Sequence, residues 1–254
     1  MNIPCSHEID ATYENLSAVC PHCGTRNVFN RVSDLHTSKP IDLRTVTCLD
    51  SACGRQFNIN GDWASPAHAM LLFDCYGFLE SKRFMQCVLT VEQAYEVFFS
   101  HFLHVQLIYR PFATDGSHDL PRLNRLAKLL YDRIQGHGFD KLRRLFLKLV
   151  VDNVAPRTLS EAEAVIGKLP KSKQAELREA IKGVSDPGLR ELLLRLDATK
   201  VNELRNRVVH KDAYRPTREE AKSLHEEAEH ILDGLTSRLR LRGDGPWYAS
   251  RAGR

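Results

Sequence analysis

The chain has 254 residues, 43% of them hydrophobic and 27% charged, which is enough to bury the core of one or two domains. This composition excludes an intrinsically disordered chain, and no apolar run is long enough to span a bilayer. The net charge of +4 divides unevenly: residues 1–62 carry −2 and the remainder carries +6, so the C-terminal part suits a polyanionic partner.

The N-terminus and the cysteine count indicate the compartment. Residues 1–10 lack the apolar stretch of a secretory signal, so we expect a cytoplasmic protein without a membrane partner. Seven cysteines are an odd number, and four of them occur in two closely spaced pairs. In a reducing compartment this pattern favours a metal site over disulfide bonds.

The two cysteine pairs predict a zinc ribbon. Each pair is followed directly by a glycine, Gly24 or Gly54, which permits the left-handed backbone that turns amides toward sulfur. Four thiolates on two β-turns form the tetrahedral cage that Zn²⁺ prefers, and a small β module needs such a metal to fold. The predicted ligands of this structural Zn²⁺ are Cys20, Cys23, Cys48 and Cys53.

The residues around the pairs define the module and its alternative ligands. We assign it to residues 1–62, since a linker containing glycine and proline follows. The second pair has four residues between its cysteines instead of the usual two, so His22 or His36 remains an alternative ligand. Three short strands are predicted here, at 28–32, 43–47 and 56–60.

From residue 63 onward the sequence predicts a helical bundle, which extends to residue 242 and makes the protein mainly α. Apolar residues recur at threes and fours from 84 to 109, which requires packing against other helices in a bundle or a dimer. Residues 110–119 are expected to form a turn-rich connection. The helical segments expected before residue 157 are 67–79, 84–109 and two within 121–152, split at 136–138.

Three further segments have specific interpretations. Eight basic residues against two acidic ones between 122 and 148 indicate either a phosphate-binding face or an ordinary solvated helix surface. Segment 157–185, with a capping box at 160–163 and a charged helix at 171–183, is interpreted as a helical insertion packed loosely on the bundle. Residues 243–254 form a basic tail.

Two helices are predicted at the C-terminal end. The first begins at Asp186, an N-cap followed by proline at the first helical position, and its apolar residues recur as far as Val208. The second follows a capping box at 216–220 and extends to about residue 239. Although this helix carries an apolar repeat, its last residues include several charged and polar side chains.

Arg205, Asn206 and His210 form the polar group at that helix end. On a helix Asn206 and His210 lie within about 40° of each other, and Arg205 lies about 7.5 Å along the axis from His210. A histidine can move protons near neutral pH, and an arginine holds phosphate with two parallel bonds. Asn206 can donate to a phosphate oxygen or orient His210. These groups suit cleavage at a phosphate.

The pattern Arg-Asn-x-x-x-His at 205–210 resembles the signature of HEPN-superfamily endoribonucleases, and the long helices at 84–109 and 186–239 follow the order of that family. The resemblance implies an all-α, usually dimeric, HEPN-like bundle. It implies RNA cleavage without a catalytic metal, in which the 2′-hydroxyl attacks and leaves a 2′,3′-cyclic phosphate and a 5′-hydroxyl. Since one histidine cannot be both acid and base in a single step, a two-fold homodimer with two clusters in one cleft is expected.

The resemblance also implies roles for individual residues. Arg205, Asn206 and His210 take the catalytic roles. In this family an acidic residue on an early helix often supports the arginine and histidine of the motif. Glu96 is assigned this role and Glu92 is the alternative, but either residue could instead be an ordinary solvated charge on the helix surface. The residues nearest the motif that would hold RNA, or be ordinary surface charges, are Arg207, Lys211 and Arg215.

The sequence therefore predicts an RNA-binding, HEPN-type endoribonuclease, of the kind found in toxin–antitoxin or anti-phage defence. An antitoxin or regulatory protein is a possible partner. Two alternatives remain: a HEPN-like bundle that binds RNA, nucleotide or a protein without cutting, and a zinc-ribbon regulator that binds nucleic acid through residues 15–60. The −2 charge of residues 1–62 counts against the second alternative.

Overall fold

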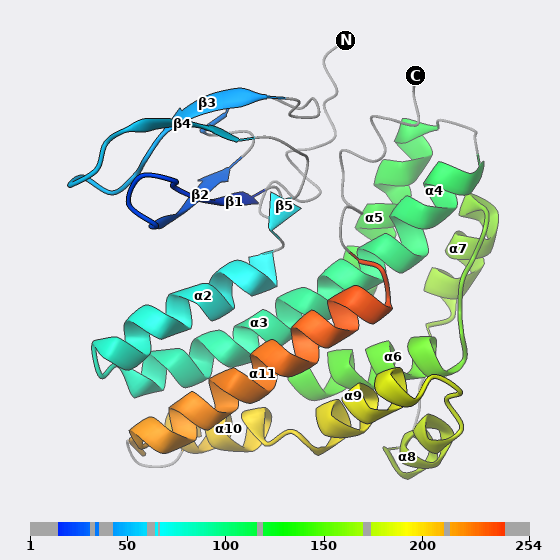
Figure 1. Ribbon diagram of the computed structural model, residues 1–254. Coiled ribbons are helices and arrows are strands. Elements are labelled where there is room, and N and C mark those ends of the chain that lie inside the picture. Colours follow the sequence, from blue (N-terminus) through cyan, green and yellow to red (C-terminus); the bar gives the residue numbers. More distant parts are fainter. Residues whose placement is uncertain are drawn as a thin grey trace.

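A mainly helical body and a small N-terminal β module make up the computed structural model, which confirms the predicted fold class (Figure 1). No helix among the described residues combines the length and apolar character that crossing a membrane requires. Lys211, His36 and the basic tail lie outside the described part of the chain. The structure describes residues 15–30, 34–35, 43–59, 64–65, 67–115, 119–169, 174–210 and 214–241.

The β module consists of two small antiparallel sheets. One has the strand order β2-β1-β5, and the other is the β3-β4 hairpin. In β4 the side chains alternate, with Phe57 and Ile59 buried and Gln56 and Asn58 exposed, as a sheet covered on one face requires. The strands are β1 (Asn15–Val19), β2 (Arg26–Asn30), β3 (Arg44–Thr47), β4 (Gln56–Ile59) and β5 (Ala64–Ser65).

The helical body begins at α2 and ends with α11, and α3 runs through its middle beside both of them (Figure 1). The helices are α2 (Ala67–Glu80), α3 (Phe84–His104), the π-helical turn η2 (Val105–Tyr109), α4 (Arg110–Asp115), α5 (Leu120–Ile134), α6 (Phe139–Val151), α7 (Leu159–Gly167), α8 (Gln174–Lys182), α9 (Pro187–Ala198), α10 (Val201–His210) and α11 (Arg218–Arg238).

The apolar seam predicted along 84–109 is buried inside this chain. Tyr95, Phe98 and Phe99 are fully buried on α3, which packs against α2, α6, α10 and α11. Phe146 of α6 contacts both phenylalanines, with ring centroids 5.5 and 5.3 Å apart. The connection predicted at 110–119 is wrong in its first half, because α3 continues through η2 into α4.

The single helix predicted from Asp186 to Val208 is two helices. Asp186 is the N-cap as predicted, since its carboxylate accepts bonds from the amides of Gly188 and Leu189 at 2.9 and 3.1 Å. However, α9 ends at Ala198, and the next residue, Thr199, adopts an extended ψ of 140°. Because of this break α10 does not continue the axis of α9, and it packs against α3, which positions the residues of the 205–210 motif.

The described residues of segment 157–185 pack against the main core, contrary to the predicted loose insertion. Leu159 and Ile166 of α7 and Ile181 of α8 are fully buried in the main core. The capping box predicted at 160–163 is also displaced, because Thr158 is the N-cap and accepts a bond from the Glu161 amide at 3.2 Å. The capping box at 216–220 is confirmed, with Thr217 as the N-cap of α11.

Candidate functional site

The polar residues of α10 form a connected cluster that extends from the nearly buried Glu92 of α3 to the exposed His210. Arg205 Nε lies 2.8 Å from Glu92 Oε2 of α3, and Glu92 is almost buried, with 11% of its side chain exposed. Arg205 Nη1 donates to Asn206 Oδ1 at 3.0 Å and lies 3.4 Å from His210 Nε2. Arginine carries only donors, so the bond to His210 requires an unprotonated imidazole nitrogen. The structure therefore brings together the three predicted catalytic residues.

The carboxylate that holds Arg205 comes from Glu92, the alternative to the assigned Glu96. Glu96 lies one turn further along α3, where burial raises its pKa and the Phe139 backbone and Arg205 both act to lower it. Burial raises the pKa of Glu92 to about 6, and the neighbouring Arg205 opposes that rise only in part. Burial also raises the pKa of Glu96 above its ordinary value. Helical spacing cannot separate these two residues, because both lie beside the apolar seam.

Two residues that the sequence did not single out extend the cluster toward α6. Asn206 Nδ2 donates to Asn202 Oδ1 at 3.4 Å, and Asn202 Nδ2 donates to Asp140 Oδ2 at 2.7 Å. The other carboxylate oxygen of Asp140 accepts from Arg143 Nη2 at 2.9 Å. Asn202 is one helical turn before Asn206, which is the only signal in the sequence that could have indicated it.

Of the predicted RNA-binding residues, Arg207 and Arg215 lie in the described part of the chain, and Arg207 is held by other side chains. Arg207 stacks over the Tyr214 ring, 3.8 Å from its centroid, and Arg207 Nη1 lies 3.6 Å from Glu220 Oε1. Tyr214 in turn donates to Glu220 at 2.6 Å. Arg207 therefore holds the start of α11 against α10. Arg215 is exposed beside this group.

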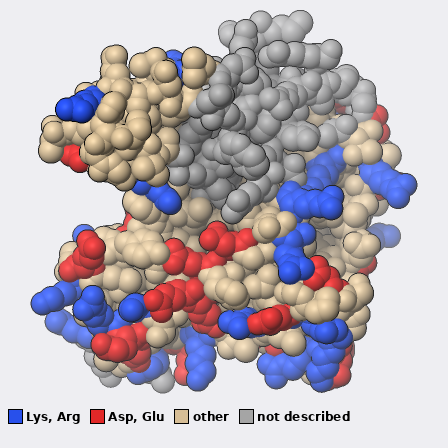
Figure 2. All heavy atoms as spheres, viewed as in Figure 1, with Lys and Arg blue, Asp and Glu red and all other residues tan. Residues whose placement is uncertain are grey.

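Charge is distributed unevenly over the helical body. On the face in Figure 2, acidic side chains gather over α11, and basic side chains gather along the lower edge of the body. Within the basic segment 122–148, Arg122 pairs with Glu163 at 3.2 Å and Lys128 pairs with Asp132 at 3.1 Å. Part of the positive charge there is thus neutralised within the chain.

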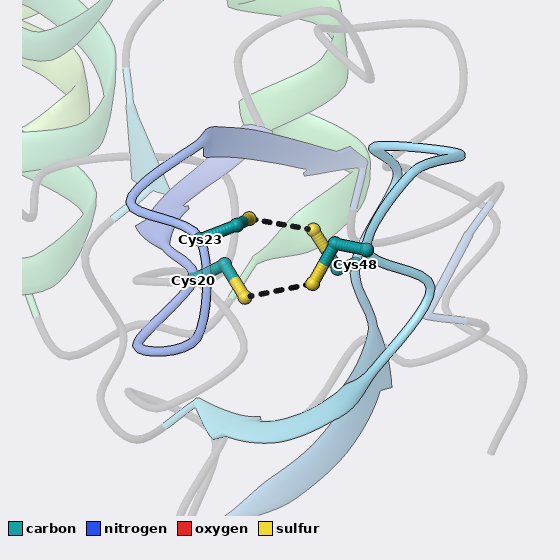
Figure 3. A group of neighbouring side chains, drawn as sticks. Cys20, Cys23 and Cys48 are labelled. Carbon is teal, nitrogen blue, oxygen red and sulfur yellow. Dashed lines mark hydrogen bonds between the residues drawn. The ribbon is translucent and has the colours of Figure 1, made fainter.

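The four cysteines predicted as ligands meet at one point of the β module. Figure 3 shows Cys20, Cys23 and Cys48 directed toward one another across the two knuckles, which are the turns at 20–24 and 48–54. Cys20 Sγ lies 3.9 Å from Cys53 Sγ, Cys23 Sγ lies 3.7 Å from Cys48 Sγ, and all four sulfurs lie within 4.8 Å of one another. Thiolates around a tetrahedral ion with bonds of about 2.3 Å are about 3.8 Å apart. The geometry is compatible with a structural metal site.

Local backbone conformation and hydrogen bonds hold the two cysteine pairs together. Gly24 and Gly54 have φ values of +76° and +53°, as predicted for the residue after each pair. The buried Asn27 joins the two knuckles, donating to the Thr25 carbonyl at 2.9 Å and accepting from the Leu49 amide. His22 Nε2 lies 3.1 Å from the Gln56 carbonyl and is not in the cluster.

The cysteine cluster is the only group of three or more potential metal ligands at this spacing among the residues that the structure describes. No protein-family model matches the chain, and neither a curated protein nor a solved structure matches it. The resemblance to the HEPN superfamily therefore rests on residues 205–210 and the order of the helices.

Proposed function

We propose that the protein is a cytoplasmic endoribonuclease that cleaves RNA through attack of the 2′-hydroxyl, leaving a 2′,3′-cyclic phosphate and a 5′-hydroxyl. The observation that carries the proposal is the 3.4 Å contact between Arg205 Nη1 and His210 Nε2, with Arg205 anchored by Glu92. This arrangement presents a fixed guanidinium and an exposed imidazole to one phosphate. The proposal includes no catalytic metal.

Each residue has a role that its chemistry permits. His210 accepts the 2′-hydroxyl proton or protonates the leaving 5′-oxygen, since histidine titrates near neutral pH. Arg205 stabilises the negative charge that develops on the phosphorane, which is the larger contribution in reactions of this kind. Glu92 and Asn206 hold Arg205 in place, because both accept bonds from its guanidinium.

A single His210 supplies one proton-transfer group, so the proposed active unit is a homodimer with two clusters facing one RNA strand. The exposed position of His210 at the end of α10 leaves it accessible to a second copy. Arg215, which is exposed, is proposed to contact the RNA backbone, and Lys211 is proposed for the same role from the sequence alone.

The cysteine cluster is proposed to hold Zn²⁺, which four thiolates with tetrahedral spacing favour. Its role is structural: it stabilises a module whose described core contains few large residues. In cells we propose a function in toxin–antitoxin or anti-phage defence, with an antitoxin or regulatory protein as partner. This cellular role rests on the HEPN resemblance.

The direct test is a cleavage assay with the purified full chain, a mixed-sequence RNA and EDTA added in a parallel reaction. We expect cleavage in both reactions and a loss of about 100-fold or more in His210→Ala and Arg205→Ala. His230→Ala is the matched control, because His230 is also an exposed helical histidine but lies on α11. Circular dichroism confirms that each variant retains its helices.

Two outcomes would count against the proposal. Cleavage that persists in folded His210→Ala would show that another group performs the chemistry. RNA binding by the wild-type protein without any cleavage would support the binding module instead.

A further inference from the structure

We propose that Asp140 and Asn202 are positioning residues, which fix the amide orientation of Asn206 and thereby hold Arg205 against His210. The observation is a directional chain of side-chain bonds from α6 to the site, through Asp140, Asn202, Asn206 and Arg205. As a statement about catalysis this inference rests on the proposed function. The orientation itself can be tested without it.

The direction of the chain begins at Asp140, which carries a carboxylate and can only accept. Its Oδ1 accepts from Arg143 Nη2 at 2.9 Å, so Oδ2 remains for α10. Arg143 is itself fixed: it is 7% exposed, its guanidinium lies 5.2 Å from the Phe139 ring centroid, and Nη1 contacts the Asp197 carbonyl at 3.3 Å. The acceptor at the start of the chain is therefore held in place.

Each amide then transmits the direction to the next, because an amide donates from one end and accepts at the other. Asn202 must turn its NH₂ group toward Asp140, at 2.7 Å, so its oxygen faces Asn206. Asn206 must then turn its NH₂ group toward Asn202, at 3.4 Å, so its oxygen faces Arg205 Nη1 at 3.0 Å. A reversed Asn206 would direct its own N–H groups at a guanidinium that has only donors.

The consequence for the site is specific. Arg205 Nη1 is shared between Asn206 Oδ1 and His210 Nε2, so the orientation of Asn206, together with the Glu92 ion pair at Nε, fixes where the guanidinium lies relative to the imidazole. The sequence allowed two roles for Asn206, contact with phosphate or orientation of His210, and the structure adds a contact that neither role includes, the bond from Arg205 Nη1 to Asn206 Oδ1. It supports a third role, in which Asn206 orients Arg205 and Asp140 fixes Asn206 through Asn202.

This series of hydrogen bonds predicts a specific pattern of loss and rescue among substitutions at 140 and 202. In Asp140→Asn, Arg143 continues to donate to the oxygen of the new amide, so the new NH₂ group faces Asn202. Asn202 must then turn its oxygen toward residue 140, and Asn206 must reverse in turn. Asn202→Asp places two carboxylates at a distance of 2.7 Å, which separates them or requires a shared proton. The exchange Asp140→Asn with Asn202→Asp restores a donor at 140 and an acceptor at 202, so Asn206 returns to its native orientation.

The experiment measures these three variants and Asp152→Asn, a control whose carboxylate makes only an i,i+4 pair with Lys148 on the same helix. We expect kcat for RNA cleavage to fall about tenfold or more in each single variant, with KM little changed. In the exchanged variant we expect kcat within about threefold of wild type. A purely structural role would change the melting temperature without this pattern of loss and rescue.

A second measurement does not depend on cleavage. Hydrogen exchange of the Arg205 Nε–H, followed by NMR in the RNA-free protein, should be faster in both single variants and return to the wild-type rate in the exchanged variant. If the wild-type protein cleaves no RNA, the proposed function fails and this measurement still decides the inference. Single variants with wild-type exchange and activity, or an exchanged variant no better than either, would overturn it.

Discussion

Glu92 offers a test in which stability and activity should change in opposite directions. Burial raises its pKa from 4.5 to about 6 despite the ion pair with Arg205, so the folded protein prefers the neutral carboxyl. Below pH 4.5 the contribution of Glu92 to stability is fully present, and it is lost as the pH rises through about 6. The shift corresponds to about 2 kcal/mol of unfolding free energy above that range.

Glu92→Gln removes this cost, so we expect its unfolding free energy at pH 7.5 to exceed that of wild type by about 1 to 2 kcal/mol. The difference should disappear near pH 4.5, where both side chains are neutral. The same substitution removes the charge that anchors Arg205 at 2.8 Å, so we expect RNA cleavage to fall about 10-fold to 100-fold.

Glu96→Gln is the matched control on the same helix. Burial also raises the pKa of Glu96, but the ion pair with Arg205 is made by Glu92. We therefore expect some stabilisation and little loss of cleavage. Urea denaturation at pH 4.5, 6 and 7.5, together with cleavage rates, measures both effects. A Glu92→Gln variant that is less stable at pH 7.5, or cleaves as well as wild type, would refute this reasoning.

Four further predictions concern other parts of the chain. Elemental analysis should show that Cys53→Ser has lost bound metal and that Cys87→Ala has kept it, because Cys53 belongs to the four-cysteine cluster and Cys87 does not. Asn27→Ala should weaken metal affinity about 10-fold in a chelator competition, since Asn27 joins the knuckles. Arg207→Ala should lower the unfolding free energy by about 1 kcal/mol and leave cleavage within about threefold, because its partners are Tyr214 and Glu220. Burial lowers the pKa of His68 to about 3, so its contribution to stability should be lost as the pH falls from 6.5 toward 3, by about 2 kcal/mol at pH 5; His68→Phe should flatten that loss in acid denaturation.

Most features that follow from local chemistry were predicted correctly, although the capping box expected at 160–163 is displaced to Thr158. The N-cap at Asp186, the capping box at Thr217 and the clustering of the four cysteines depend on residues close to each other or on ligand chemistry. The apolar seam of α3 was equally clear, because fully buried residues such as Tyr95 and Phe98 repeat with the helical period.

The features that were missed depend on contacts between distant residues. No glycine or proline in the sequence marks the break between α9 and α10. At the break Thr199 is extended, and its hydroxyl donates to Glu227 Oε2 at 3.2 Å. β1 has few β-branched or aromatic residues, and it is a strand because β2 and β5 pair with it.

The candidate site shows the same limit. Arg205, Asn206 and His210 are adjacent in sequence and were named correctly as one group, which the structure brings together. Their support comes from α3 and α6, more than 60 residues earlier, and nothing in the spacing selects Glu92 over Glu96 or indicates Asp140. Which acidic residue supports an arginine is decided by packing, which a single sequence does not reveal.

The most direct measurement of the central claim compares one short RNA with the same oligonucleotide carrying a single 2′-deoxy nucleotide at the cleaved position. If His210 and Arg205 act on the 2′-hydroxyl and its phosphate, we expect the ribose form to yield a 2′,3′-cyclic phosphate by mass spectrometry and the deoxy form to remain intact. Cleavage of the deoxy form at the same position, or a product with a 5′-phosphate, would contradict the proposed chemistry.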